Sequence, residues 1–461
     1  MSRRKEEFEA VHDGKVGIYS CGPTVYSEPH IGNTRSALFA DLLKKMFLLA
    51  GYEVKHVMNI TDVGHLTGDS DDGEDKMEVE ATKEGLTVEQ ITKKYTDIFF
   101  DFSKMLNIMR PSVVSKATEH VPDQIEFLKV LEKKGYTYKT TDGIYFDTSK
   151  LDDYGYLARL DVKGNRAGER VEMGEKKNAT DFALWKFSKA GEKRLQEWDS
   201  PWGVGFPGWH LECSAMSLKY LGNPFDIHTG GTDNISPHHV NEIAQNEAFC
   251  DVCSPKGVVH YWMHGGMLIM NSGEKMSKSL GHRQTLRTEL TEKGIDPLAF
   301  RYLCLTAHYR SQMVFSEEAL KDSAIALKRL QNKTLKIKEE AGAVSYGLSD
   351  EGQILYDKIA SALFDDLNTA VALVALREML DTEVVTGDKL WIIEKIDSVF
   401  GLDLLKEQTL EIPTEVQKLL DERAMARANK DWAKSDELRD RIAEQGFVVK
   451  DSKDGQSIER N

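Results

Sequence analysis

Residues 16–33 read VGIYSCGPTVYSEPHIGN, and this stretch decides the fold that we expect. Its beginning, from Lys15 to Ser20, is short, apolar and β-prone, so it predicts a buried strand. Cys21-Gly-Pro ends that strand, and from Thr34 apolar residues recur at helical spacing until Gly51. A strand and a loop that lead to a helix N-terminus predict an anion site, because free backbone N–H groups point out of such a terminus. An ordinary strand-to-helix turn fits the same residues equally well.

A second strand-like run, YEVKHVMNI at 52–60, follows the predicted helix. A strand, a helix and a strand in this order predict a βαβ unit, and therefore a parallel sheet with a right-handed crossover. Residues 84–109 and 119–134 have the apolar spacing of amphipathic helices. Between 136 and 201, Gly, Asp and Lys are dense and short β-prone pieces alternate with turns. We interpret that region as a subdomain inserted between two halves of the parallel sheet.

The chain beyond Met270 is expected to be helical almost throughout. Helical spacing is found at 293–308, 316–342, 350–364, 367–382 and 387–400, and a charged helical pair at 413–444 precedes a short β-like end at 446–451. No period of twenty to fifty residues recurs, which excludes a repeat protein. The predicted fold class is therefore α/β, with a parallel-sheet domain, an insertion and a mostly α-helical C-terminal region.

Length, charge and cysteine content narrow the class of protein. The 461 residues predict two to four domains, and the net charge of −15 argues against indiscriminate coating of nucleic acid while leaving room for a specific RNA. Five cysteines form an odd and sparse set, which indicates a reducing compartment. The N-terminus MSRRKEEFEA has no apolar signal region, and no apolar run is long enough to cross a bilayer. We expect a cytoplasmic protein with no membrane partner.

Four side chains of the kinds that bind zinc occur in three distant places. Cys21 follows the first strand, Cys213 lies in GWHLEC at 208–213, and PHHVNE at 237–242 places His238 and Glu242 four residues apart. On a helix that spacing puts both side chains on one face. Two thiolates, an imidazole and a carboxylate suit tetrahedral Zn²⁺. Because the four are far apart in sequence, unrelated core or loop residues remain the alternative at this point.

Three local patterns are rejected as sites. Cys250-Asp-Val-Cys253 lacks a second Cys or His pair at zinc-finger spacing, so we interpret its thiols as ordinary. Gly203-Val-Gly-Phe-Pro-Gly208 matches G-x-G-x-x-G by count, but no strand precedes it and Pro207 lies inside it. The acidic run between Asp69 and Glu80 is interpreted as a solvated loop and not as a metal site.

A second anion site is predicted at 273–281, which reads GEKMSKSLG. This polar segment is bounded by glycines and carries Lys275 and Lys278. Lysines on such a segment can neutralise charge that develops on a phosphate during transfer. A basic surface loop is the alternative, but the pairing with the His30 turn on one parallel sheet favours a functional site.

These residues together resemble the class I aminoacyl-tRNA synthetases, and among them the cysteinyl-tRNA synthetase family. His30-Ile-Gly-Asn33 corresponds to the HIGH signature with Asn in the last place, and Lys275 to Ser279 is the KMSKS signature letter for letter. The segments that resemble those carrying the family's zinc ligands are YSCGPTVY at 19–26, GWHLECSAMS at 208–217 and PHHVNEIAQ at 237–245. Further likeness at 59–62, 181–186, 309–312 and 430–439 extends the resemblance over nearly the whole chain.

The resemblance implies a Rossmann-like catalytic domain in two halves, 1–112 and 202–290, around an inserted connective subdomain at 113–201. It further implies a stem-contact region at 291–335, a helical bundle on the tRNA side at 336–405 and a small tRNA-binding domain at 406–461. The implied reaction joins L-cysteine and ATP into cysteinyl-adenylate and transfers the acyl group to the 3′ end of tRNA(Cys). ATP would be accompanied by Mg²⁺. The family also favours a monomer.

The resemblance assigns roles to individual residues. Zinc would be held by Cys21, Cys213, His238 and Glu242, and would select cysteine because a thiolate is a far better zinc ligand than an alcohol. The amino-acid or adenylate pocket would be lined by Gly22, Thr61, Trp209 and His228. ATP would lie across His30, Gly32 and Asn33, and the catalytic residues would be His30, Asn33, Lys275 and Lys278. Lys278 would stabilise the transition state at the α-phosphate.

The sequence departs from the family pattern in places, and two other functions compete. After Asn59-Ile-Thr-Asp62 the chain continues as VGHLTGD with a long acidic run. The family's three-glycine run is replaced by Thr229-Gly-Gly-Thr-Asp233, and Val240 stands where the family frequently has an acidic residue. The end, SIER at 457–460, lacks a frequent tryptophan, which bears on the anticodon contacts more than on catalysis. One alternative is a cysteine ligase of thiol-cofactor synthesis on the same core, and the other is a non-catalytic zinc- and nucleotide-binding paralogue.

Overall fold

The central sheet has five parallel strands in the order β3-β2-β1-β8-β9. The computed structural model describes residues 4–65, 75–160, 174–189, 191, 194–251, 257–270, 284–341, 347–407, 413–452 and 455–460. The five strands are β1 (Lys15–Ser20), β2 (Glu53–Ile60), β3 (Val113–Lys116), β8 (Phe225–Gly231) and β9 (Val259–Gly265). Every neighbouring pair in this sheet is parallel. The predicted α/β fold with a Rossmann-like parallel sheet is thereby confirmed.

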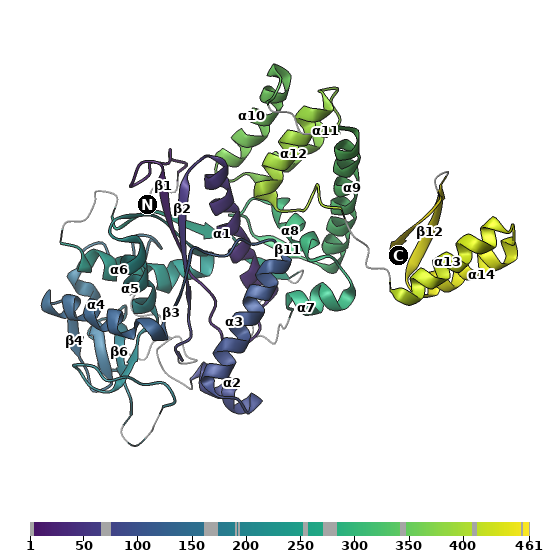
Figure 1. The fold of residues 1–461 in the computed structure, drawn as a ribbon. Helices are drawn as coiled ribbons and strands as arrows, with labels where there is room; N and C mark the ends of the chain where they lie inside the picture. The colour runs from purple at the N-terminus through teal and green to yellow at the C-terminus, as the bar shows by residue number, and fades with distance from the viewer. Residues whose placement is uncertain are drawn as a thin grey trace. The chain divides into compact units, whose positions relative to one another are not determined.

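Helices cover both faces of β1, as its alternating side chains require. Ile18 packs with Phe39 and Leu42 of α1 (Ile31–Leu49), whereas its neighbour Tyr19 packs with Met216 of α5 (Trp209–Leu221). Figure 1 shows α1 on one side of β1 and β2, and α5 on the other. Burial of both faces explains why residues 16–20 form a nearly continuous apolar run.

The strand order reverses at β1. From β1 the chain passes through α1 to β2, and through α2 (Lys76–Glu84) and α3 (Val88–Met105) to β3, on one side of the sheet. The second half starts at β8 on the other side of β1 and continues through α6 (Val240–Phe249) to β9. In open parallel sheets, ligands bind beyond the carboxyl ends of the strands where the order reverses. Here that place lies beyond Ser20 and Gly231.

The insertion between the two halves has its own antiparallel sheet. Its strands are β4 (Thr137–Lys139), β5 (Gly143–Phe146), β6 (Phe182–Phe187) and β7 (Gly205–Pro207), with α4 (Val121–Lys133) packed in the same core. The parallel sheet still includes β3, beyond residue 112, and the insertion's sheet extends to β7, beyond residue 201. The glycine pattern at 203–208 contains this edge strand, and its last glycine, Gly208, is the N-cap of α5.

A mostly helical region follows the second half of the sheet. It contains α7 (Leu286–Glu289), α8 (Pro297–Leu305), α9 (Glu317–Ala341), α10 (Asp350–Phe364), α11 (Thr369–Leu380) and α12 (Thr386–Phe400). Two short parallel strands, β10 (Leu268–Met270) and β11 (Met313–Phe315), were not predicted from the sequence. Buried side chains of α1 and β1 share one apolar core with α8, α9, α10, α11 and α12. The helical bundle is therefore packed directly against the catalytic sheet.

The C-terminal residues form a separate compact unit. The chain divides into Met1–Leu405 and Lys406–Asn461, and the second unit has its own apolar core. It consists of the helical pair α13 (Thr414–Ala428) and α14 (Trp432–Glu444), followed by the antiparallel strands β12 (Phe447–Ser452) and β13 (Gly455–Arg460). The helical pair and the first of these strands agree with the prediction, whereas β13 was missed.

Two sequence predictions are corrected by the fold. Helix α1 begins at Ile31 and not at Thr34, because the His30 side chain caps it. In the described part of the acidic run, residues 76–80 belong to α2 and Asp75 is its buried N-cap, bonded to Arg194. That part of the run is therefore ordered structure and not a solvated loop. Within the described residues, no helix is long and apolar enough to cross a membrane.

Short helical turns complete the chain. They lie at Thr118–His120 (η1), Thr148–Lys150 (η2), Thr232–Asn234 (η3), Ile235–His239 (η4) and Thr291–Lys293 (η6). One of them bears on the site, because His238 lies in η4, directly before α6, and not inside α6 as the sequence predicted.

Candidate functional site

A cavity of about 1080 Å³ opens where the strand order reverses. Its wall includes the residues that follow β1, the first turn of α1, the first turn of α5 and the glycines that end β8. The sequence-predicted residues that line it are Cys21, Gly22, His30, Gly32, Asn33 and Trp209. The same cavity is thus lined by residues predicted to bind a metal and by residues predicted to bind a nucleotide.

The four predicted metal ligands come together beside this cavity. Cys21, Cys213, His238 and Glu242 each offer one ligand atom, and these atoms all lie within 4.8 Å of one another. Three of the residues are buried, and Cys21 is partly buried. They come from the end of β1, from α5, from η4 and from α6, so only the tertiary fold assembles them. This explains why their sequence spacing is uninformative.

One buried oxygen of this cluster has no hydrogen bond. Glu242 Oε1 accepts none from the described residues, although His238 Nε2 lies 3.0 Å from it. Zinc bonds to N and O of about 2.0–2.1 Å at a tetrahedral angle place two ligand atoms roughly 3.3 Å apart. The separation of these two atoms therefore suits a shared ion, and the set of two thiols, one imidazole and one carboxylate suits zinc. The residues present fit a zinc ion.

Without an ion the cluster resists ionisation. The pKa of Cys213 is raised well above its ordinary value by its hydrogen bond to Cys21 and by burial. Burial also raises the pKa of Glu242, and it lowers the pKa of His238 well below the usual value. Buried thiols and a buried carboxylate in contact cannot all ionise unless a cation joins them, and metal binding would release their protons.

Two further histidines orient the cluster. His210 Nδ1 lies 2.8 Å from His238 Nδ1, which leaves the Nε2 atom of His238 facing the cluster. His228 Nε2 lies 2.9 Å from Glu242 Oε2, which leaves Oε1 facing His238. Partners of this kind fix the ring and carboxylate orientation of metal ligands. Sequence reasoning missed His210, although it stands three residues before Cys213 in a segment already singled out.

A second set of four ligand atoms overlaps the first. Cys21, His228, His239 and Glu242 also lie within 4.8 Å of one another. In this set, however, His228 and Glu242 already hydrogen-bond each other at 2.9 Å, and Cys21 Sγ lies 3.3 Å from His239 Nε2. The first set is different, because Glu242 Oε1 accepts no hydrogen bond from the described residues and lies 3.0 Å from His238 Nε2. The first set therefore suits a metal ion better than the second.

The nucleotide signature lies at the start of α1. The His30 side chain accepts a hydrogen bond from the Asn33 backbone N–H, with 3.3 Å between Nδ1 and N, and so caps the helix. A Cβ atom on Gly32 would lie 3.0 Å from the His30 ring, so a larger residue would push against the cap. The cap, the glycine and Asn33 all line the cavity. Helix N-termini of this kind favour phosphate groups.

A chain of hydrogen bonds supports the loop after β1. The Gly22 N–H donates to Asn59 Oδ1 at 2.9 Å, Asn59 Nδ2 donates to the Thr61 hydroxyl at 3.0 Å, and Thr61 donates to Glu212 at 3.2 Å. His65 lies 2.7 Å from the other oxygen of Glu212 and lines the cavity. A Cβ on Gly22 would lie 1.6 Å from the Asn59 carbonyl oxygen, so only glycine fits there.

The remaining predicted residues lie in different settings. Trp209 is 37% exposed, and its ring stacks on His238 with 4.3 Å between centroids. Thr61 and His228 are buried behind the cavity wall, where they contact Glu212 and Glu242. Lys275 and Lys278 fall outside the described residues. Lys76 and Lys186, which the sequence did not single out, line the cavity.

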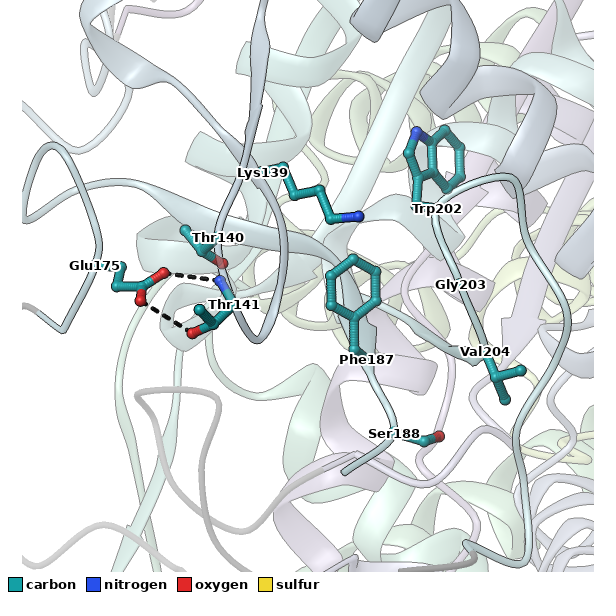
Figure 2. A pocket seen from close by; sticks show the side chains of 9 residues that line it. All are labelled: Lys139, Thr140, Thr141, Glu175, Phe187, Ser188, Trp202, Gly203 and Val204. Carbon is teal, nitrogen blue, oxygen red and sulfur yellow. Dashed lines mark hydrogen bonds between the residues drawn. The ribbon is translucent and has the colours of Figure 1, made fainter. Parts of the chain in front are cut away.

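A second, shallow pocket of about 720 Å³ lies on the insertion (Figure 2). The Lys139 ammonium lies 5.1 Å from the centre of the Phe187 ring, beside Trp202, and the Glu175 carboxylate accepts hydrogen bonds from the backbone and hydroxyl of Thr141. None of the predicted ligand or signature residues lines this pocket. The chemistry therefore belongs to the larger cavity.

Two family models match the chain, one on each side of residues 326–408. Residues 7–325 match the model described as the tRNA synthetases class I (C) catalytic domain. Residues 409–458 match the cysteinyl-tRNA ligase anticodon binding domain. The second match falls within the separate C-terminal unit.

Curated relatives match over the full length. The chain is 46% identical to cysteine–tRNA ligase 1 of Burkholderia lata, over 99% of this chain and 95% of the relative. It is likewise 46% identical to the cysteine–tRNA ligase of Novosphingobium aromaticivorans, over 98% of this chain and 94% of the relative.

Solved structures share the fold at low identity. Methionyl-tRNA synthetase of Mycobacterium tuberculosis in complex with methionyl-adenylate superposes with a TM-score of 0.58 at 16% identity, covering 91% of this chain and 96% of that one. LeuRS of Agrobacterium radiobacter, in a complex with tRNA and LeuAMS, gives a TM-score of 0.61 at 13% identity over 88% and 87% of the chains. These likenesses concern the fold alone.

Proposed function

The chain belongs to the cysteine–tRNA ligase family and is an aminoacyl-tRNA ligase, and we propose that its large cavity performs both half-reactions of that activity. Cysteine and ATP would meet there, the cysteine carboxylate would attack the α-phosphate, and pyrophosphate would leave. The resulting cysteinyl-adenylate would pass its acyl group to the terminal hydroxyl of tRNA(Cys). The observation that carries this proposal is that Cys21 and His30 line one cavity at the reversal of the strand order.

The amino-acid side of the cavity would be the wall beside the metal cluster. Cys21, Cys213, His238 and Glu242 would hold Zn²⁺, which when bound supplies a preference for a thiolate over a hydroxyl. Gly22 and Trp209 would contact the substrate, since both line the cavity next to Cys21 and His238. Thr61 and His228 would support this wall from behind through Glu212 and Glu242. An apolar pocket alone separates near-isosteres poorly, so a metal ligand explains selectivity better.

The nucleotide side would be the first turn of α1. His30, Gly32 and Asn33 would hold ATP with its Mg²⁺, because a capped helix N-terminus beside a cavity favours phosphate groups. Lys275 and Lys278 would act from the KMSKS segment, with Lys278 stabilising the charge that develops on the α-phosphate. Removal of one such donor typically costs about 3–4 kcal/mol of transition-state stabilisation. We expect Lys278→Ala to slow adenylate formation accordingly.

The tRNA would be bound by parts of the chain outside the cavity. Residues 113–201 and 291–335 would contact its acceptor arm, and residues 336–405 and 406–461 its anticodon side. In the C-terminal unit, Trp432 is 57% exposed and Arg427 lies over its ring, an arrangement on which an unpaired base can stack. The match of 409–458 to an anticodon binding domain favours tRNA as the acyl acceptor over a small amine. We further propose a cytoplasmic monomer.

Serine substitution of one cysteine tests the metal proposal. Cys213→Ser should lose bound zinc and lose cysteine-dependent ATP–pyrophosphate exchange, because an alcohol is a poor zinc ligand at neutral pH. Cys250→Ser is the matched control, since Cys250 is a partly buried free cysteine outside the cluster and should keep both properties. Undiminished zinc content or exchange in Cys213→Ser would overturn the assignment of this ligand.

A further inference from the structure

A single buried arginine joins two backbone turns, one of which lines the cavity. One turn, Gly265 to Leu268, connects β9 to β10 and lines the cavity. The other, at 308–311, precedes β11. We propose that Arg35 of α1 is a positioning residue for adenylate formation, which holds both turns at a fixed distance from the His30 cap. This proposal rests on the proposed function and adds to it a residue that touches neither substrate.

The hydrogen bonds of Arg35 are directed at backbone carbonyl groups in both turns. Its Nη1 donates to the carbonyl oxygens of Gly266 at 2.6 Å and Met267 at 3.0 Å. Its Nη2 donates to those of Ser311 at 2.7 Å and His308 at 3.4 Å. Arg35 is 5% exposed, and none of these four partners is a carboxylate. A planar guanidinium with five fixed donors can bind two turns at once, which a lysine cannot.

The two turns also approach each other closely. The Gly266 N–H donates to the Tyr309 carbonyl at 2.7 Å, and the Met313 N–H donates to the Met267 carbonyl at 3.1 Å. A Cβ atom on Gly266 would lie 2.3 Å from the Ser311 carbonyl oxygen, so only glycine permits this approach. The carbonyl groups that Arg35 binds are thus presented in a fixed arrangement.

The same helix holds the turns at a second point. Phe39, one turn after Arg35 in α1, stacks on Tyr309 with 4.4 Å between centroids and 5° between ring planes. The Tyr309 hydroxyl donates to Asp366 at 2.8 Å, in the corner between α10 and α11. The 308–311 turn is therefore bound on one side by α1 and on the other by the helical bundle.

The first turn of α1 also binds the chain beyond the KMSKS segment. The Ile31 N–H donates to the Gln284 carbonyl at 2.9 Å, and His30 forms an isolated β-bridge with Thr285. On the other side of that segment, Arg35 binds Gly266 and Met267, directly before β10. The described residues on both flanks of 271–283 are thus bound by residues 30–35. Arg35 therefore sets the distance between the His30 cap and the described turn at Gly266 and Met267.

The test compares Arg35→Met and Arg35→Lys with Lys44→Met. Lys44 is a matched control, because it is another buried cation of α1, 6% exposed, and its ammonium donates to the Arg110 carbonyl away from the cavity. In ATP–pyrophosphate exchange we expect Arg35→Met to lower kcat about 100-fold, the typical effect of a displacement of roughly 1 Å in an active site. The KM for cysteine should not change, since Arg35 does not contact the metal cluster. Arg35→Lys should give an intermediate kcat, and Lys44→Met the wild-type kcat.

Amide hydrogen exchange supplies a readout that is independent of activity. The N–H groups of Gly266 and Met313 should exchange faster in Arg35→Met than in the wild type, and at the wild-type rate in Lys44→Met. The positioning role would be overturned by an unchanged kcat in Arg35→Met, or by an equal loss of kcat in Lys44→Met. It would also be overturned if the KM for cysteine rose in parallel with the loss of kcat, or if both Arg35 variants were unfolded. Absence of exchange activity in the wild type would instead contradict the proposed function, while the amide measurement would still test Arg35.

Discussion

At the scale of single residues, the orientation of His238 depends on His210. Their Nδ1 atoms lie 2.8 Å apart, and His210 makes no contribution of its own to the set of four ligand atoms. We expect His210→Leu to lower zinc affinity about 10- to 100-fold, as loss of a ligand's hydrogen-bonding partner typically does. Competition with a chromophoric chelator measures this affinity. The control is His12→Asn, which changes an exposed histidine and should bind zinc with the affinity of the wild type. Equal zinc affinities in the wild type, His12→Asn and His210→Leu would contradict the role of His210.

The four residues that form the proposed metal cluster could be predicted from the sequence, and the residues that contact and orient them could not. Cys21, Cys213, His238 and Glu242 could be selected by side-chain type and by resemblance, because metal ligands must be Cys, His or carboxylate. The contact between His228 and Glu242 could not, since it depends on the packing of β8 against α6. The sequence therefore placed His228 in the substrate pocket, whereas the structure buries it fully beside Glu242, a proposed metal ligand.

At the scale of elements, α1 is held to three other helices by a buried ion pair. Arg301 of α8 lies 2.7 Å from Asp41 of α1, and both side chains are fully buried. Arg301 also donates to the carbonyl groups of Leu106, after α3, and Val399, in α12. The helix that begins at the His30 cap is thus fixed relative to the bundle by one guanidinium.

Removal of this arginine should be strongly destabilising. Arg301→Met removes one of the two cations that pair with the buried Asp41 carboxylate in the described residues, and it leaves backbone carbonyls unpaired, which should cost about 3–5 kcal/mol of unfolding free energy. Thermal and urea unfolding midpoints measure the loss. Arg329→Met, on the exposed surface of α9, is the control and should shift the midpoint little. Equal midpoints for the two variants would show that the pair does not hold α1.

Element prediction succeeded where periodicity or turn chemistry was strong. The spacing of apolar residues gave β1, α9 and α12 within a few residues of their observed bounds. Strands β10 and β11 have three residues each and no detectable alternation, and each is defined only by its partner more than forty positions away. The start of α1 was placed late because a histidine, which is an unusual N-cap, replaces the expected Ser, Thr, Asp or Asn.

At the scale of the whole molecule, the chain divides into two compact units. The first compact unit, Met1–Leu405, contains the sheet, the insertion, the bundle and the cavity, and the second, Lys406–Asn461, has an independent core. The parallel sheet and the helical C-terminal region were expected from the sequence. The bounds of the insertion were less predictable, because β7 belongs to its sheet only through pairing with β6.

Deletion of residues 406–461 should therefore separate the two half-reactions. The truncated chain should retain cysteine-dependent ATP–pyrophosphate exchange, because no residue of the cavity is removed. Charging of tRNA should weaken through a higher KM for tRNA, since the deleted unit includes the match to an anticodon binding domain. Exchange and charging are assayed on the same preparation. Unchanged charging kinetics would exclude a tRNA contact by this unit, and lost exchange would show that the cavity depends on it.

The most direct test of the central claim is amino-acid-dependent ATP–pyrophosphate exchange before and after removal of zinc. We predict that the protein supports exchange with cysteine and not with serine, because the ligands Cys21, Cys213, His238 and Glu242 would hold the ion that distinguishes a thiolate from a hydroxyl. A chelator should abolish exchange with cysteine, and added Zn²⁺ should restore it. Full exchange with cysteine in the zinc-free protein, or exchange with serine equal to that with cysteine, would contradict the account.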